Sequence, residues 1–161
     1  MTTKDAFTEE ELARLERAPI VAAMAITLAD PGGPIEAVKE SMAGIKTVQE
    51  AAQSSDQPEL VREITASLSE KMRARQNPLK DFRPKGALAG QEILDELSAA
   101  AGTVAQKGTP EEAAAFRELL LTSAQRAADA AKEGGFMGFK AERVSEGEQA
   151  MLDKLREALA A

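Results

Sequence analysis

The sequence contains no cysteine, histidine, tryptophan or tyrosine. Without histidine and cysteine the chain cannot build a Ser-His or Cys-His nucleophile, a histidine-held zinc or iron site, or a reactive thiolate. A disulfide is excluded for the same reason. The reactive groups that are left belong to Asp, Glu, Lys, Arg, Ser and Thr, and in this sequence they form no recognised catalytic constellation. We therefore expect no catalytic residues and no cofactor.

Residues that favour strands are scarce, whereas residues that favour helices are abundant. Alanine supplies 32 of the 161 residues, and aromatic residues amount to only 3%. A hydrophobic fraction of 43% is ordinary for a chain that packs a core. The composition predicts an all-α protein, a single compact bundle-like domain of six to seven helices. Residues 1–6 are expected to form a flexible N-terminal tail.

The balance of charge and the short apolar runs restrict the partners. A net charge of −7 argues against nucleic acid, because phosphates require a basic surface. The longest apolar run, Ile20 to Ala29, covers ten positions, whereas a membrane span needs about 20. The first residues lack the apolar segment of a signal peptide. We expect a cytoplasmic protein that binds neither nucleic acid nor a membrane.

Helix ends are marked by caps, prolines and glycines. Capping boxes predict that helices begin after Thr8, Thr109 and Ser145. Pro19 predicts either two helices, over about 8–17 and 19–29, or one helix kinked at the proline. Further helices are expected from Pro34, in the segment of Leu60 to Met72, and from about Pro84 to Lys107.

Apolar side chains at helical spacing are expected to face the core. One such stripe comprises Ile35, Val38, Met42, Ile45 and Val48, and Leu88 is expected to point inward in the helix after Pro84. Another stripe comprises Phe116, Leu120, Ala124, Ala127 and Ala131. Because its side chains shrink along the helix, the last stripe predicts that a neighbouring helix approaches closely at the alanine end.

The most unusual segment is the glycine-rich loop that holds Phe136, Met137 and Phe139. One interpretation is an apolar loop that binds a partner, and these three residues are then the candidates for partner binding. The other interpretation is that the phenylalanines pack into the bundle and fix the last helix, as apolar residues usually do. A phosphate-binding glycine loop would follow a strand, and this one follows a helix.

A basic segment interrupts the acidic chain. Residues 71–85 carry six cations against the single Asp81. Such a group could bind a phosphate, an anionic metabolite or an acidic partner. The candidate residues for an anion site are Arg73, Arg75, Lys80, Arg83 and Lys85. The alternative is that the basic residues complement the negative end of their helix and are otherwise solvated.

Carboxylates give little support to an enzyme or a metal site. Glu92 and Asp95 match half of the metal motif of the all-helical nucleotide pyrophosphatases. The other half would need a glutamate at position 13 or 14, where Ala13 and Arg14 stand. Acidic pairs on one helix mostly face water and bind Lys or Arg. We expect no metal centre.

Three segments carry a resemblance to known proteins: Phe7 to Pro19, Ala29 to Gly33, and Lys132 to Glu146 with its Gly-Gly-Phe-x-Gly-Phe loop. Their order and spacing resemble an uncharacterised family of small bacterial all-helical proteins, which implies a helical fold and a bacterial origin. Two acidic glycine turns, 30–36 and 133–148, are also similar to those of tellurite-resistance TerB-like helical domains. This second similarity implies a cation role, for which Asp30, Glu36, Glu133 and Glu146 are the weak candidates.

Two classes of function follow. The first is a non-enzymatic helical interaction or scaffold domain, whose partner is an unknown protein or a second copy of the chain. The alternative is a module that binds a small anion through the basic segment 71–85, or a divalent cation through the acidic turns.

Overall fold

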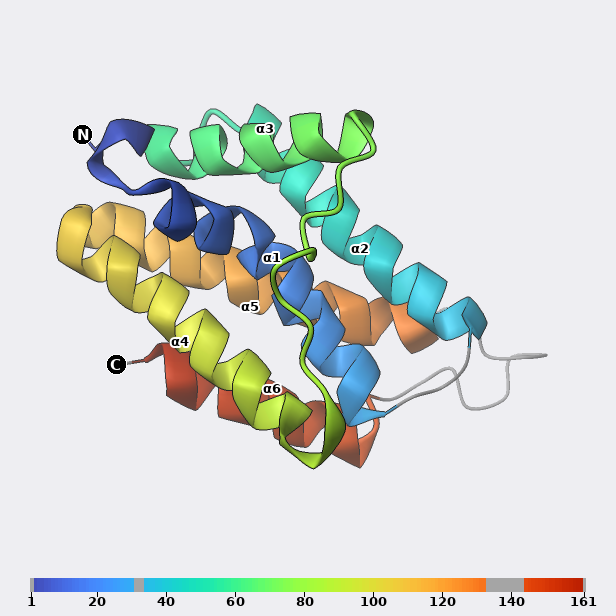
Figure 1. The fold of residues 1–161 in the computed structure, drawn as a ribbon. Coiled ribbons are helices and arrows are strands. Elements are labelled where there is room, and N and C mark those ends of the chain that lie inside the picture. Colours follow the sequence, from blue (N-terminus) through green and yellow to red (C-terminus); the bar gives the residue numbers. More distant parts are fainter. Residues whose placement is uncertain (1, 31–33, 133–143, 161) are drawn as a thin grey trace.

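Six α-helices account for most of the structure. The computed structural model describes residues 2–30, 34–132 and 144–160, and within these ranges it contains no strand. The helices are α1 Glu9–Ala29, α2 Pro34–Gln53, α3 Glu59–Arg73, α4 Ala89–Lys107, α5 Pro110–Lys132 and α6 Glu146–Leu159, with short 3-10 helices at Lys4–Ala6 (η1) and Gly86–Leu88 (η2) (Figure 1). The prediction of an all-helical, bundle-like fold is confirmed. None of the described helices combines the length and apolarity that a bilayer crossing requires.

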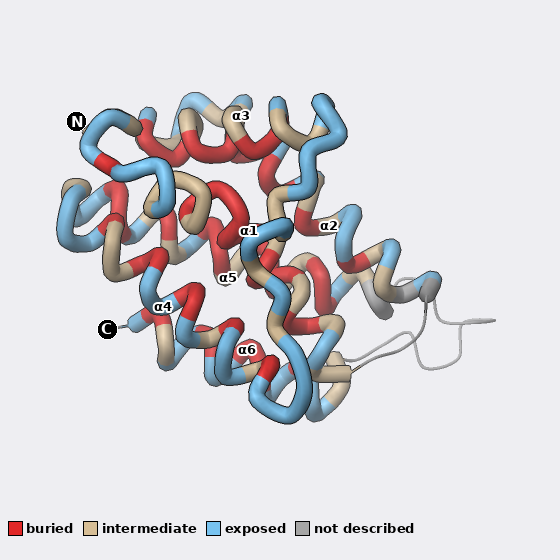
Figure 2. The backbone as a smooth tube through the Cα atoms, viewed as in Figure 1, coloured by how far each residue is buried: buried red, intermediate tan, exposed pale blue. Residues whose placement is uncertain are grey.

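The helix α1 lies at the centre of the bundle. It packs against all five other α-helices, and Figure 1 shows it between α3 at one edge and α4 and α6 at the other. Its second half, which holds the longest apolar run of the sequence, has Val21, Ala22, Ala25 and Ile26 fully buried (Figure 2). The core therefore forms around this helix.

Pro19 lies inside α1, so the prediction of two separate helices was wrong and the single-helix alternative is the observed one. A proline in a helix interior costs about 3 kcal/mol, because it lacks an N–H and crowds the preceding turn. Here the neighbouring helices hold the segment in place: Ala18 is fully buried, and Ser123 Oγ of α5 donates a 2.7 Å hydrogen bond to the Pro19 carbonyl.

The predicted capping boxes are observed at two helices. In α1 the Glu11 amide donates to Thr8 Oγ1 at 3.1 Å, and the Thr8 amide donates to Glu11 at 2.8 Å. In α5 the Glu112 amide donates to Thr109 at 3.1 Å, and the Thr109 amide donates to Glu112 at 2.8 Å. At α6, Ser145 Oγ accepts from the amide of Glu148. These starts are encoded locally, within four residues each.

Residues 2–6, which belong to the segment 1–6 predicted as a flexible tail, form hydrogen bonds with α3, α4 and α5. The Thr2 amide donates a 2.9 Å hydrogen bond to Glu112, the Lys4 amide donates to Glu63, and Phe7 is buried. Burial would raise the pKa of Glu112, but hydrogen bonds from Thr109 and Thr2 outweigh it and hold that pKa below its ordinary value. Glu112 therefore stays ionised near neutral pH. Through Thr2 and Thr109 it connects the residues before α1 to the start of α5.

The helix expected from Pro84 begins only at Ala89, and Leu88, predicted to face inward, is 69% exposed. Pro84 lies in the connection before it, Lys85 is extended, and Gly86 has a φ of +70°, so the chain reaches α4 through the short η2 instead. A glycine tolerates this left-handed backbone without strain. Leu88 is thereby left outside the buried face of α4.

Two glycines give a matched test of the contact between α1 and α6. A Cβ at Gly147 would stand 2.8 Å from the Ala29 carbonyl oxygen, whereas a Cβ at Gly102 of α4 would meet nothing within 4 Å. Gly102→Ala should raise the free energy of unfolding by about 0.5–1 kcal/mol through helix propensity. Gly147→Ala should lower it by about 1–3 kcal/mol, because α1 and α6 must separate. Urea denaturation measures both, and equal stabilisation by the two alanines would contradict this contact.

Candidate functional site

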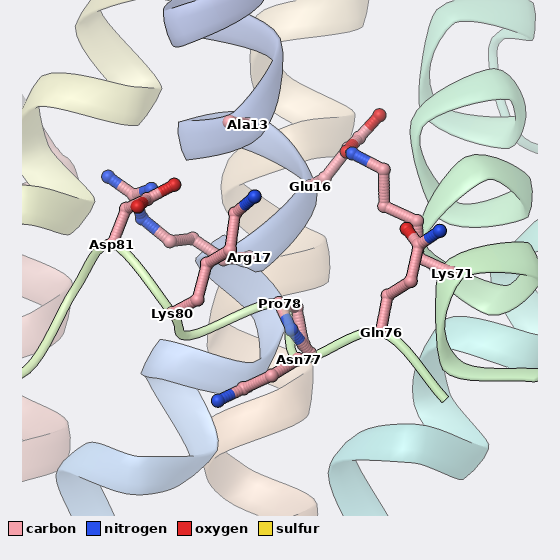
Figure 3. A pocket seen from close by; sticks show the side chains of 9 residues that line it. All are labelled: Ala13, Glu16, Arg17, Lys71, Gln76, Asn77, Pro78, Lys80 and Asp81. Atoms are coloured by element: carbon pink, nitrogen blue, oxygen red, sulfur yellow. The ribbon is translucent and has the colours of Figure 1, made fainter. Parts of the chain in front are cut away.

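A pocket of about 270 Å³ lies between α1, α3 and the connection that follows α3. Figure 3 shows its lining from close by. We call it the loop pocket, and its lining residues are Ala13, Glu16 and Arg17 of α1, Lys71 of α3, and Gln76, Asn77, Pro78, Lys80 and Asp81 of the connection. The pocket thus combines two buried charges of the central helix with polar residues of a loop.

The first buried charge in the loop pocket is Glu16, whose two oxygens are both used. Ser67 donates to Oε1 at 2.6 Å, and Lys71 forms an ion pair with Oε2. Glu16 is 5% exposed, so this carboxylate is compensated within the protein. The acceptors on this side of the pocket are therefore occupied.

The second buried charge is Arg17, which is 8% exposed. Its Nε and Nη2 atoms donate to Glu96 Oε1 of α4 at 2.9 and 2.6 Å, and Glu96 is also 3.4 Å from Arg14. The guanidinium lies 5.6 Å from the centre of the Phe82 ring, within cation–π range. Arg17 thus joins α1 to α4 and to the loop.

The loop has a defined geometry where it leaves α3. The amide of Arg75 donates to the Met72 carbonyl and that of Gln76 to the Lys71 carbonyl, as in a Schellman C-cap. Arg75 takes the position in which glycine is favoured, with a φ of +59°. Further along, Asn77 Oδ1 accepts a 2.9 Å hydrogen bond from the amide of Leu79. This turn directs the chain back over α1.

Of the five predicted anion-binding residues, only Lys80 lines the loop pocket. The other four, Arg73, Arg75, Arg83 and Lys85, are exposed and line no pocket described here. Sequence reasoning missed Glu16 and Arg17, since their partners lie 51 to 79 residues away in the chain. The available clue was their position immediately before the apolar half of α1.

The other predicted site residues are only partly described. Phe136, Met137, Phe139 and Glu133 lie outside the described residues, and so does the side chain of Glu36. Asp30 caps the end of α1, and Glu146 is exposed at the first position of α6. Among the described residues no group of three or more acidic side chains could hold a metal ion.

A second surface of interest is the outer face of α2. Ile35, Val38 and Met42 are 73%, 58% and 63% exposed, so the prediction that they face the core was wrong. We call these three residues the α2 outer row. Of the remaining two predicted residues, Ile45 is half-buried and Val48 is fully buried. Figure 2 shows the burial decreasing toward the first turns of α2.

The helix buries a different set of residues because one contact with α1 is very close. A Cβ at Gly44 would stand 3.0 Å from the Cβ of Ala23, so only a glycine allows this approach without a shift. Glu40, which accepts a hydrogen bond from Thr27, and Thr47 lie on the same buried side. At 100° per residue this side is opposite the α2 outer row. Three large apolar side chains are thereby directed away from the core.

Beside the α2 outer row lies a groove of about 1,120 Å³ between α2 and α5. We call it the α2–α5 groove, and it is lined by Lys39, Met42, Ala43, Ile45, Lys46, Gln49 and Glu50 of α2 and by Arg126, Asp129 and Ala130 of α5. Arg126 forms an ion pair with Glu50 and holds the pKa of that carboxyl below its ordinary value. The groove is open and carries more cations than anions.

Comparison of the chain with protein-family models, with curated proteins and with solved structures finds no match. The resemblance to a bacterial helical family and the similarity to TerB-like domains therefore stay predictions. The sites above are interpreted from their own chemistry.

Proposed function

We propose that the protein is a helical interaction module that binds an acidic, amphipathic segment of a partner protein along α2. The observation that carries the proposal is the α2 outer row, Ile35, Val38 and Met42, which is more than half exposed at every position. Scattered single apolar residues on a surface are common, whereas a continuous apolar row is typical of an interaction site. A helix laid along such a row uses anchors at the same three- and four-residue spacing.

Charge supports an acidic partner. Lys39, Lys46 and Arg126 line the α2–α5 groove against Glu50 and Asp129, although the whole chain carries −7. Glu50 forms ion pairs with Arg126 and, at 4.0 Å, with Lys46, whose side chain is 75% exposed. Complementary charge steers a partner and fixes its register. Acidic residues flanking an apolar helix face would meet these cations.

The same cations argue against a second copy of the chain as the occupant. Pairing two α2 helices about a two-fold axis at Met42 sets position 39 opposite position 45 of the second copy. Lys39 then lies next to Lys46 of the second copy, twice in the dimer. Like charges that lie next to each other across an interface oppose association.

A pair of synthetic peptides tests the proposal. One is an amphipathic helix of about 20 residues with leucine on one face and glutamate on the other. Its twin has lysine in place of every glutamate. We expect the acidic peptide to bind more tightly in fluorescence anisotropy, and the amide signals of α2 residues 35–46 to shift in NMR spectra.

Substitution of the α2 outer row should weaken this binding. Val38→Ser combined with Met42→Ser removes two anchors and should raise the dissociation constant at least about tenfold. Leu88→Ser is the matched control, because Leu88 is 69% exposed but lies at the start of α4. Unchanged binding by the double variant would refute the proposal, as would a loss of folding stability, which would place these side chains in a contact within the chain. Concentration-dependent dimerisation that the double variant abolishes would instead identify a second copy as the occupant.

A further inference from the structure

The loop pocket contains a buried cation that uses only part of its hydrogen-bonding capacity. A guanidinium has five N–H donors, and Arg17 gives one from Nε and one from Nη2 to Glu96. Its Nη1 atom makes no hydrogen bond within the described part of the chain. This atom is not sealed from solvent. Nη1 is therefore accessible, and together with the second hydrogen of Nη2 it forms a fork that matches a carboxylate or phosphate.

A second cation of the same pocket comes from the loop. Lys80 is exposed, and its side chain makes no ion pair or hydrogen bond with the described residues. Figure 3 shows its side chain extending from the loop across the pocket toward α1. Lys80 and Arg17 thus approach the pocket from opposite walls, one at the surface and one from the buried side.

The free groups of the pocket are mainly donors. Both oxygens of Glu16 already accept, from Ser67 and Lys71, and Asn77 Oδ1 accepts from Leu79. Asp81 is the one lining carboxylate without an ion pair or hydrogen bond to the described residues. Ammonium and guanidinium groups only donate, so the pocket favours a ligand that accepts.

We propose that the loop pocket binds a small oxyanion, held between the open edge of Arg17 and the ammonium group of Lys80. The ligand class is a phosphate or a small carboxylate, because the free groups of the pocket donate, and a volume of about 270 Å³ has room for a ligand that carries such a group. The site is distinct from the α2 outer row. Asp81 at the pocket opposes the anion and limits its affinity.

Titration at constant ionic strength tests this site. Inorganic phosphate and acetate are added separately to the full chain, with chloride as the reference anion, while amide signals are followed by NMR. We expect saturable shifts of the amide signals of Ala13, Gln76, Asn77 and residues 79–81 with at least one of the two. Tighter binding of phosphate identifies a phosphate ligand, and tighter binding of acetate identifies a carboxylate. Shifts that chloride reproduces at the same ionic strength, or the absence of saturation with both anions, would overturn the proposal.

Three loop variants give the site its controls. Lys80→Ala should weaken binding at least about fivefold, because it removes a charge-assisted contact. Arg83→Ala removes an equally exposed cation of the same loop that does not line the pocket, so its effect should stay below about twofold. Asp81→Asn should tighten binding. Equal effects of Lys80→Ala and Arg83→Ala would show a diffuse basic surface and would refute a defined site.

Discussion

Replacing Glu96 with leucine is expected to lower the free energy of unfolding by about 3–5 kcal/mol, because a buried charge loses its partner. Glu96 is 9% exposed and serves two cations, Arg17 at 2.6 Å and Arg14 at 3.4 Å. Arg17 is itself buried, so among the described residues its guanidinium would keep the ring of Phe82 as its remaining partner. Urea or guanidinium denaturation followed by circular dichroism measures the loss.

The double variant Glu96→Leu with Arg17→Met is the decisive control. Replacing both members of a buried ion pair by apolar residues is often neutral or stabilising, so we expect it to recover most of the loss. The exposed pair Arg156 and Asp153 provides a reference, since Asp153→Asn should change stability by less than about 1 kcal/mol. Additive effects of the two substitutions at 17 and 96 would show that the pair is not coupled in the folded state.

This pair has a second consequence for the loop pocket. Glu96 holds one edge of the Arg17 guanidinium and leaves the other edge open, so the same contact that joins α1 to α4 also presents donors to the pocket. Binding of an oxyanion there would add to stability in proportion to the logarithm of its concentration above the dissociation constant. Stability and binding at this place are therefore linked, and substitutions at Lys80 separate them because Lys80 is exposed.

Features that depend on a few neighbouring residues were predictable from the sequence. The capping boxes at Thr8 and Thr109 form the expected hydrogen bonds, and the all-helical class follows from composition. Pro19 shows that tertiary packing can override a local sequence rule. The rule that proline breaks a helix is correct for an isolated segment, but a helix packed on all sides by neighbours continues through it.

The orientation of α2 could not be predicted, for a physical reason. Hydrophobic spacing correctly places Ile35, Val38 and Met42 on one face, but which face turns inward is decided by the approach of Gly44 to Ala23. That approach joins residues 21 positions apart in the chain, and periodicity carries no information about it.

The loop pocket was predictable only in part. The count of basic residues in 71–85 includes Lys80, which lines the pocket, but it cannot separate Lys80 from Arg83 or Arg73, which do not. A run of basic residues shows how many cations are present, but it does not show where their side chains point. Glu16 and Arg17 become recognisable only when their distant partners are placed beside them.

The inner face of α5 provides the other substitution with a large expected effect. Phe116, Leu120, Ala124 and Ala127 are all fully buried, so four of the five residues predicted on this face do face the core, and the side chain of Ala131 lies outside the described residues. Phe116→Ala should lower the free energy of unfolding by about 3–5 kcal/mol, because it leaves a cavity where the largest side chain stood. Phe116→Leu should cost less, since leucine fills part of that space.

At the other end of the same face the opposite change should destabilise. Ala124→Leu adds three carbon atoms where a neighbouring helix already lies against a fully buried methyl group, at a cost of about 1–3 kcal/mol. Ala114→Leu is the control on the exposed side of α5 and should stay within about 0.5 kcal/mol. If Ala124→Leu were tolerated as well as Ala114→Leu, the small residues would not be required for close packing. The decrease in side-chain size along the inner face of α5 would then have no structural role, and its alanines would reflect helix propensity alone.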